Sequence, residues 1–252
     1  MVHIEERDTT AVIRLEHGKA NALDIELLGD LSDAIRRARE GGARAAVLTG
    51  SGSIFSAGVD LFRVMAGAEP YASQFIPALT ATFLELFEYP LPLVAAVNGH
   101  AIAGGCILAC CCDYRVMAEG KGTIGVPELL VGVEFPTVAL EIMRHSVPAN
   151  ELHALIYTGQ LCVAGQAHDR GLIDEVVPPE RLQARALEIA ARMARIPGDV
   201  FAATKQALRR DALERMHRDT TRDDVVRRWS HPDTRRRIQE YLDAAIPRGQ
   251  RS

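Results

Sequence analysis

The sequence has no surplus of charge of one sign and no apolar run long enough to cross a bilayer. Its 29 Lys and Arg residues are balanced by 33 Asp and Glu residues, which gives a formal net charge of −4. Without a basic surplus there is no global field that would attract nucleic acid or an anionic membrane, so we expect neither as a partner. The longest apolar segments, 91–97 and 102–112, fall well short of the roughly 20 residues that a membrane-spanning helix needs.

Spacings typical of metal ligands and of disulfides are missing as well. Four of the five cysteines lie between residues 106 and 112, and three of these are adjacent, so a helix would point their side chains in different directions. No secretory signal precedes the strand-like residues 2–4. We therefore expect buried thiols, no metal site and a location in the reducing cytoplasm.

Short apolar runs alternate with amphipathic helical patterns up to about residue 178. Residues 2–6 and 11–16 predict a hairpin, and the continuous apolar runs 45–49 and 93–97 are typical of buried parallel strands. Asp24 precedes a helical pattern and suits its N-cap. A strand, a helix and then another strand imply right-handed crossover units, so the pattern predicts an α/β fold.

Only helical patterns follow the pair Pro178-Pro179. They contain few bulky apolar residues, so we expect them to pack on the α/β body or on a neighbouring subunit instead of forming their own core. This part of the chain is rich in arginine between residues 209 and 237. We interpret these arginines as a solvated helical face with local ion pairs, with a phosphate or RNA surface as the alternative.

Two glycine-bearing turns, 55–61 and 98–106, each follow an apolar strand pattern and precede a helical one. Backbone N–H groups at such turns can converge on one carbonyl oxygen and stabilise the negative charge that develops there. Further along, Glu128 follows a proline and precedes Leu-Leu-Val. Apolar surroundings would raise its pKa and suit an acid/base residue; the alternative is an exposed glutamate at the start of a helix.

In order and spacing, the motifs at 55–61, 97–106, 112–113 and 127–129 resemble those of the crotonase family, which includes enoyl-CoA hydratases and isomerases. The resemblance implies a crotonase-like spiral of ββα units over residues 1–195. It also implies a helical C-terminal trimerisation region over residues 196–252, and a homotrimer or a dimer of trimers. The implied substrate is an acyl-CoA thioester, with no cofactor beyond the coenzyme A that the substrate carries.

Matching the family motifs places the oxyanion donors on the backbone N–H groups of Ala57 and Gly104, and the catalytic carboxylate on Glu128. Phe55 and Ser56 are expected to flank the path of the coenzyme A, and Asp60 most simply caps the next helix. The full set of expected substrate contacts is Phe55, Ser56, Gly58, Asp60, Gly105, Ile107 and Arg63, the last as the nearest cation for phosphate.

Ile107 departs from the pattern of the family's hydratases, which have a glutamate here that helps to activate water. An isoleucine cannot polarise water, whereas Glu128 alone suits the transfer of a proton between C2 and C4 of an enoyl thioester. The family's Δ3,Δ2-enoyl-CoA isomerases are similar, so we predict an isomerase. Two alternatives are a hydratase in which Glu134 supplies the second carboxylate, and a non-catalytic protein that binds acyl-CoA or a partner. Glu141 is expected on the surface.

Overall fold

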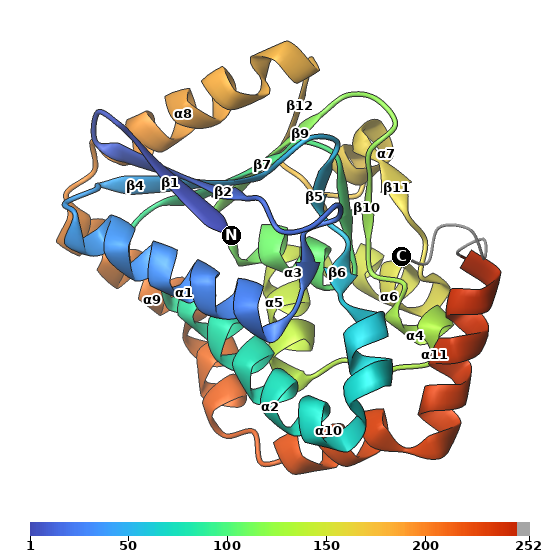
Figure 1. Ribbon diagram of the computed structural model, residues 1–252. Coiled ribbons are helices and arrows are strands. Elements are labelled where there is room, and N and C mark those ends of the chain that lie inside the picture. Colours follow the sequence, from blue (N-terminus) through green and yellow to red (C-terminus); the bar gives the residue numbers. More distant parts are fainter. Residues whose placement is uncertain (246–252) are drawn as a thin grey trace.

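The computed structural model describes residues 1–245, and its strands form three sheets (Figure 1). The strands are β1 (Val2–Arg7), β2 (Thr10–Leu15), β3 (Ala22–Leu23), β4 (Ala45–Gly50), β5 (Ile54–Ser56), β6 (Gly58–Val59), β7 (Leu93–Val97), β8 (His100–Ile102), β9 (Tyr114–Ala118), β10 (Thr123–Gly125), β11 (Cys162–Val163) and β12 (Glu175–Val177). The helices are α1 (Ile25–Glu40), α2 (Leu61–Glu88), α3 (Gly104–Cys111), α4 (Glu128–Val131), α5 (Thr137–Ser146), α6 (Ala149–Thr158), α7 (Ala164–Asp169), the 3-10 turn η1 (Pro179–Arg181), α8 (Leu182–Met193), α9 (Gly198–His217), α10 (Arg222–Ser230) and α11 (Pro232–Ala245).

The chain winds as a spiral because the same unit, two strands and a helix, is repeated three times. The six-stranded sheet has the order β1-β2-β4-β7-β9-β12, and a four-stranded sheet has the order β11-β10-β8-β5. β4, β7 and β9 are therefore neighbours in the first sheet, while β5, β8 and β10 are neighbours in the second. Along the chain, β4 and β5 precede α2, β7 and β8 precede α3, and β9 and β10 precede α4. The predicted α/β architecture is confirmed.

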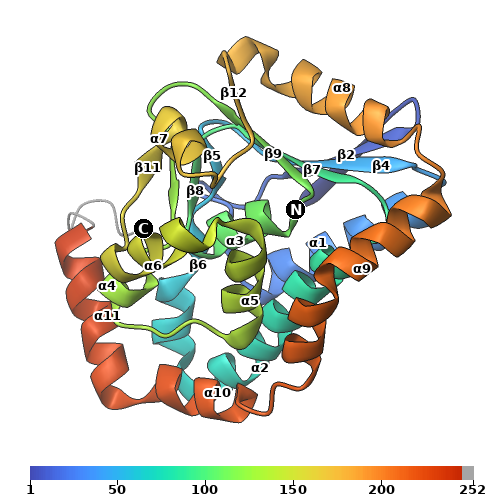
Figure 2. The same cartoon turned by 180° about the vertical axis from the view of Figure 1, so that it is seen from behind.

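Alternate residues of the large sheet face two different hydrophobic layers. Ala46 and Leu48 of β4 join the main core with α1 and α2, whereas Val47 packs with Ile189 of α8 on the opposite face. The two ribbon views agree that α8 covers one face of this sheet, with the other helices on the other side (Figures 1 and 2). Burial of both faces explains why β4 and β7 are continuous apolar runs in the sequence.

The N-terminal predictions agree closely with the structure. β1 pairs with β2 as an antiparallel hairpin, and the Asp24 carboxylate accepts a hydrogen bond from Leu27 N at the start of α1. α2 begins at Leu61 and is kinked at Ala68, where φ is +50°. All five cysteines are free thiols, and all are buried.

The C-terminal helices share the core of the body. Met216, Trp229 and Ile238 belong to the same hydrophobic cluster as β4 and α3. An ion-pair cluster also joins the two parts: the Asp113 carboxylate, just before β9, accepts hydrogen bonds from Lys205 Nζ (2.8 Å) and Arg209 Nη2 (2.9 Å) of α9.

Arg209 is only 4 % exposed, so the prediction of a solvated arginine face is wrong at this position. Its guanidinium instead fixes α9 to the end of a core strand. The last residues of the predicted C-terminal region, 246–252, lie outside the described part of the chain.

Within residues 1–245, no helix combines the length and apolarity that crossing a membrane would require. The same part of the chain holds no group of three or more His, Cys, Asp or Glu side chains arranged to bind a metal ion.

Candidate active site

Three segments that follow strands of the four-stranded sheet meet at one cavity of about 100 Å³. Residues 57–59 follow β5, Gly104 follows β8, and Glu128 follows β10 with Val126 and Pro127 between them. The carboxyl ends of neighbouring parallel strands lie at one edge of a sheet, where α/β proteins commonly bind ligands. The spiral thus brings together two glycine turns and one carboxylate that are far apart in the sequence.

The two glycine turns are in direct contact. A Cβ at Gly58 would lie 2.5 Å from the carbonyl oxygen of Ile102 and 3.0 Å from the nitrogen of Gly104, and Gly58 itself has φ +81°. A Cβ at Gly105 would lie 2.2 Å from the carbonyl oxygen of Ser56. Only glycine permits this approach, because any side chain would push the two backbones apart.

The N–H group of Ala57 is not available to a ligand in this arrangement. It donates to the carbonyl oxygen of Ala20 at 2.9 Å. Its assignment as an oxyanion donor is therefore wrong, because an occupied donor cannot also bind an incoming oxygen without losing that bond. Ala57 still lines the cavity.

For Val59, two residues further along, we infer that the backbone N–H group points to the opposite side of the strand. β6 pairs with β3 in parallel, and Asp60 N donates to Leu23 O at 3.0 Å. Because successive N–H groups of a strand point to opposite sides, the N–H group of Val59 points away from β3. Val59 also lines the cavity, so we assign the first oxyanion donor of this turn to its backbone nitrogen.

Gly104 occupies the position that the sequence predicts for the second donor. It is the first residue of α3 and lines the cavity, and the first N–H groups of a helix have no partner within that helix. The preceding Ala103 has φ +51° and ψ −123°, a conformation that costs a non-glycine residue of order 1–3 kcal/mol. The backbone is therefore held in a strained conformation where the helix begins, with its positive dipole end at the cavity.

Glu128 begins α4 and is 9 % exposed. Its Oε2 atom is buried and has no hydrogen-bond partner among residues 1–245. Removal from water without a compensating cation raises the pKa of this carboxyl from 4.5 to about 8. The prediction of apolar surroundings and a raised pKa is confirmed, and the alternative of an exposed glutamate is excluded.

The expected substrate contacts divide into two groups. Ile107 lines the cavity beside Gly104 and Glu128. Phe55 and Ser56 are fully buried, so their side chains are not exposed to a ligand, and the expectation that these residues flank the coenzyme A path stays a prediction. Gly58 and Gly105 contribute the close backbone contact described above, instead of lining the cavity.

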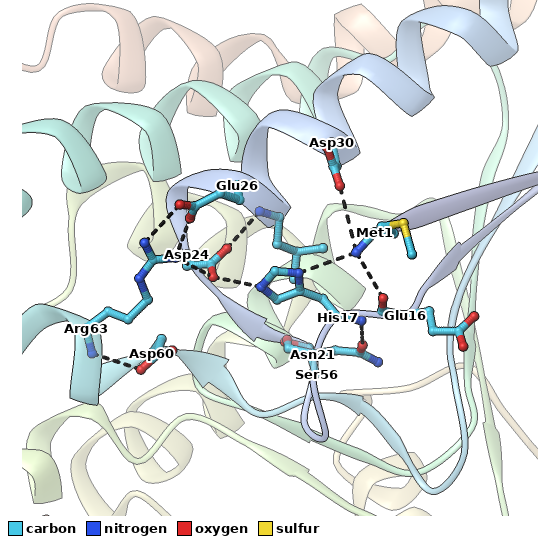
Figure 3. Close-up of polar contacts among 11 residues, drawn as sticks. Met1, Glu16, His17, Asn21, Asp24, Glu26, Asp30, Ser56, Asp60 and Arg63 are labelled. Carbon is cyan, nitrogen blue, oxygen red and sulfur yellow. Dashed lines mark hydrogen bonds and ion pairs between the residues drawn. The ribbon is translucent and has the colours of Figure 1, made fainter. Parts of the chain in front are cut away.

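Arg63 and Asp60 have structural partners. The Arg63 guanidinium binds the carboxylates of Asp24 and Glu26, and its role as the nearest cation for phosphate stays a prediction (Figure 3). These ion pairs raise its pKa further above the ordinary value. Asp60 accepts a hydrogen bond from Arg63 N at 3.0 Å, which confirms it as the N-cap of α2.

The other glutamates considered from the sequence do not line this cavity. Glu134 forms an ion pair with Arg228 in a neighbouring surface groove. Glu141 was expected on the surface, but it is only 3 % exposed and forms ion pairs with Arg144 and Arg215. Within the part of the chain that the structure describes, the single carboxylate in the cavity lining is therefore that of Glu128.

Two lining residues were not found by the sequence reasoning, Trp229 of α10 and Tyr241 of α11. Both ribbon views place these helices beside α2 and α4, so the C-terminal region closes the cavity from outside the spiral (Figures 1 and 2). The only available signal was that Trp229 is the one tryptophan of the chain and lies in an amphipathic helix.

Comparison with known proteins agrees with this geometry. The family model for enoyl-CoA hydratase/isomerase matches residues 5–244. Human mitochondrial enoyl-CoA delta isomerase 1 is 28% identical over 238 residues, covering 92% of this chain and 79% of the relative. A putative enoyl-CoA hydratase of Thermus thermophilus is 34% identical over 213 residues, covering 82% and 83%.

The fold is also that of solved crotonase-type enzymes. The crystal structure of human mitochondrial delta3-delta2-enoyl-CoA isomerase superposes with a TM-score of 0.92 at 27% identity, covering 96% of this chain and 97% of that one. The agreement extends over the ββα spiral and the C-terminal helices. The chain therefore belongs to the enoyl-CoA hydratase/isomerase family.

Proposed function

We propose that this member of the family is an enoyl-CoA isomerase that moves a double bond from C3 to C2 through a thioester enolate. The thioester oxygen would accept hydrogen bonds from the backbone N–H groups of Val59 and Gly104. The carboxylate of Glu128 would remove a proton from C2, and the electron pair would delocalise onto the thioester oxygen and C4. The same proton would then return from Glu128 to C4, leaving the 2-enoyl thioester and the original carboxylate.

One observation carries this proposal: among the described residues, the cavity lining contains a single carboxylate. Addition of water in this family uses two glutamates, and the place of the first is taken here by Ile107. Proton transfer between two carbons needs only one base, provided that both carbons lie within its reach. A pKa near 8 supports the role, because such a group can gain and lose a proton close to neutral pH.

The apolar lining supports the intramolecular route. Ile107, Val131 and Phe135 line the same cavity as Glu128, and their side chains offer no hydrogen-bonding group that would hold a water there. A proton held by Glu128 would therefore exchange slowly with solvent before it is returned. Isomerisation in D2O should accordingly place less than one deuterium per turnover at C4.

The direct test is to supply 3-hexenoyl-CoA and to follow the ultraviolet absorbance of the conjugated 2-enoyl thioester. We expect turnover by the wild-type protein and strong loss in Glu128→Gln, with the affinity for butyryl-CoA retained. Hydration of crotonyl-CoA at a comparable rate would instead favour the hydratase. Tight binding of both thioesters without turnover would favour a non-catalytic acyl-CoA-binding protein.

Assembly as a homotrimer or dimer of trimers, use of no cofactor beyond the thioester's coenzyme A, and a cytoplasmic location stay predictions. The first can be checked by light scattering of the purified protein. Residues 196–252 are the proposed trimerisation region, so removal of residues 198–252 should abolish any trimer that is found.

A further inference from the structure

The loop between β2 and α1 holds the first glycine turn through an unusual residue, Asn21. Its side chain is 2 % exposed, and its backbone has φ +46°, a left-handed conformation that asparagine tolerates better than most residues. A buried asparagine in this conformation must satisfy its polar groups within the protein. The hydrogen-bond partners of Asn21 therefore identify the segment that the loop fixes; His17 and Ser56 lie near it in Figure 3.

The amide of Asn21 binds the start of the turn. Its Nδ2 atom donates to the carbonyl oxygens of Ile54 (3.2 Å) and Phe55 (3.1 Å). Its Oδ1 atom accepts a hydrogen bond from His17 N at 2.8 Å, which orients the amide. Two consecutive carbonyl groups of β5 are thus fixed by one side chain.

The backbone of the same loop binds the middle of the turn. Ser56 Oγ donates to Asn21 O at 2.7 Å, and it accepts a hydrogen bond from Gly58 N at 3.2 Å. Ala57 N donates to Ala20 O at 2.9 Å. The N–H groups of Ala57 and Gly58 are therefore both committed to the loop, the first directly and the second through the serine hydroxyl.

The far end of the turn is fixed by the residues that follow Asn21. Asp60 N donates to Leu23 O, and the Asp24 carboxylate binds His17 Nε2 (2.7 Å) and Arg63 Nη1 (2.8 Å). Both ends of the turn are therefore held by the loop, which fixes the direction of the Val59 N–H group between them.

We propose that Asn21 is a positioning residue of the oxyanion hole, which acts by fixing the turn from Ile54 to Gly58 so that Val59 N points at the thioester oxygen. The proposal rests on the function proposed above, because it assigns a role to that oxygen. Asn21 touches no substrate atom; its effect is transmitted through the backbone of the turn. The hole would bind an enolate oxygen, which carries more charge than a neutral carbonyl, so a displaced donor should harm the charged state more.

The test compares two CoA thioesters that do not turn over. Butyryl-CoA has a neutral thioester carbonyl, whereas acetoacetyl-CoA can bind as its enolate and so mimics the intermediate. We expect Asn21→Ala to lower the affinity for acetoacetyl-CoA by about tenfold or more and the affinity for butyryl-CoA by less than threefold, as measured by calorimetry. In steady-state assays, kcat should fall while KM changes little. Equal weakening of both ligands by a folded variant would overturn the proposal.

Two further variants keep the test decisive. Ser56→Ala removes only the hydroxyl that links Asn21 O to Gly58 N, so it should show the same selectivity at smaller size if Asn21→Ala does not fold. Thr49→Val is the control for stability, because it removes a buried hydrogen bond from Thr49 of β4 to Ala96 O of β7, and neither residue lines the cavity. Thr49→Val should leave the ratio of the two affinities unchanged, and a shift equal to that of Ser56→Ala would overturn the proposal.

The binding assay also separates this inference from the proposed function. If the wild-type protein prefers the enolate and Asn21→Ala abolishes that preference, the positioning role holds even where 3-hexenoyl-CoA is not isomerised. If isomerisation occurs but Asn21→Ala leaves both the preference and kcat intact, the function stands and the positioning role falls.

Discussion

The carboxylates of Glu128, which is buried, and Asp113, which is partly buried, lie in two regions of this protein and differ in what surrounds them. In the cavity, one oxygen of Glu128 has no hydrogen-bond partner among residues 1–245, and the pKa of this carboxyl is raised to about 8. At the seam between the body and α9, Asp113 accepts hydrogen bonds from Lys205, Arg209 and Leu93 N. The seam also holds the larger cavity, about 340 Å³, but its carboxylate is fully paired.

The difference shows that burial alone does not mark a catalytic carboxylate. Two cations and an amide contact the carboxylate at the seam, whereas burial without a cation raises the pKa of Glu128. A paired carboxylate holds elements together, whereas an unpaired one can exchange a proton. Function is therefore better predicted from the missing partner than from the depth or the size of the cavity.

The strongest test exchanges the unpaired carboxylate. Glu128→Gln keeps the shape of the side chain but cannot accept a proton, so we expect kcat for isomerisation to fall by about 10²- to 10⁴-fold. The free energy of unfolding at pH 8 should not fall, because the amide has no charge to desolvate. Glu141→Gln is the matched control: it alters a paired buried glutamate outside the cavity and should leave kcat within a few-fold. Equal activity losses in the two variants would contradict the comparison.

The converse test breaks the seam. Asp113→Ala leaves Lys205 and Arg209 buried without their carboxylate, and loss of one partner from a buried ion pair costs about 3–5 kcal/mol. We expect urea denaturation to show that loss of stability, while the folded fraction retains near-normal KM. A variant as stable as the wild type would mean that the seam contributes little to folding.

The pH dependence should separate stability from activity. The folded-state pKa of Glu128 lies above its unfolded value of 4.5, so the folded protein binds the proton more tightly. The stability contribution is complete below pH 4.5 and is lost as the pH rises toward 8, by at most about 1.4 kcal/mol per pH unit. The base must be ionised to act, so kcat/KM should rise over the same range up to about pH 8.

Denaturation and steady-state rates across pH 5–9 would check both trends. In Glu128→Gln, the free energy of unfolding should lose the part of its pH dependence that Glu128 contributes. This loss is the difference between the pH profiles of the wild type and the variant. An activity that is constant from pH 5 to 9 would argue against this carboxyl as the base.

The smallest expected effect concerns the wall that the C-terminal region adds to the cavity. Trp229→Leu removes an aromatic ring from the lining, so kcat/KM for longer 3-enoyl chains should rise relative to shorter ones by roughly tenfold or less. Met216→Leu alters the shared core outside this lining and should leave the chain-length profile unchanged. A profile that Trp229→Leu does not alter would place the acyl chain elsewhere.

Much of the site could be predicted because its signals are local. Strand-to-helix glycine turns, a proline before Glu128 and an isoleucine at 107 are each visible within a few residues of sequence. The donor on the first turn could not be predicted in this way, because the choice between Ala57 and Val59 depends on a hydrogen bond to Ala20. The spacing of residues within one strand does not show which N–H group is already taken.

Long-range packing explains the other errors. Arg209 and Glu141 have sequence neighbours typical of an exposed helix, yet their charges are paired with Asp113 and Arg215, which lie 96 and 74 residues away. Trp229 and Tyr241 reach the cavity only because α10 and α11 fold back beside α2 and α4. The order of strands and helices was therefore predictable, while the partners of buried charges were not.

The position of Trp229 and Tyr241 has a consequence for synthesis on the ribosome. Both turns and Glu128 lie in the first half of the chain or near its middle, so they are synthesised early. The cavity still lacks part of its wall until α10 and α11 emerge. A nascent chain would hold the oxyanion donors and the base while they are still open to water. Acyl-CoA chemistry should therefore begin only after α10 and α11 have emerged, and stalled chains that end before α10 should consume no thioester.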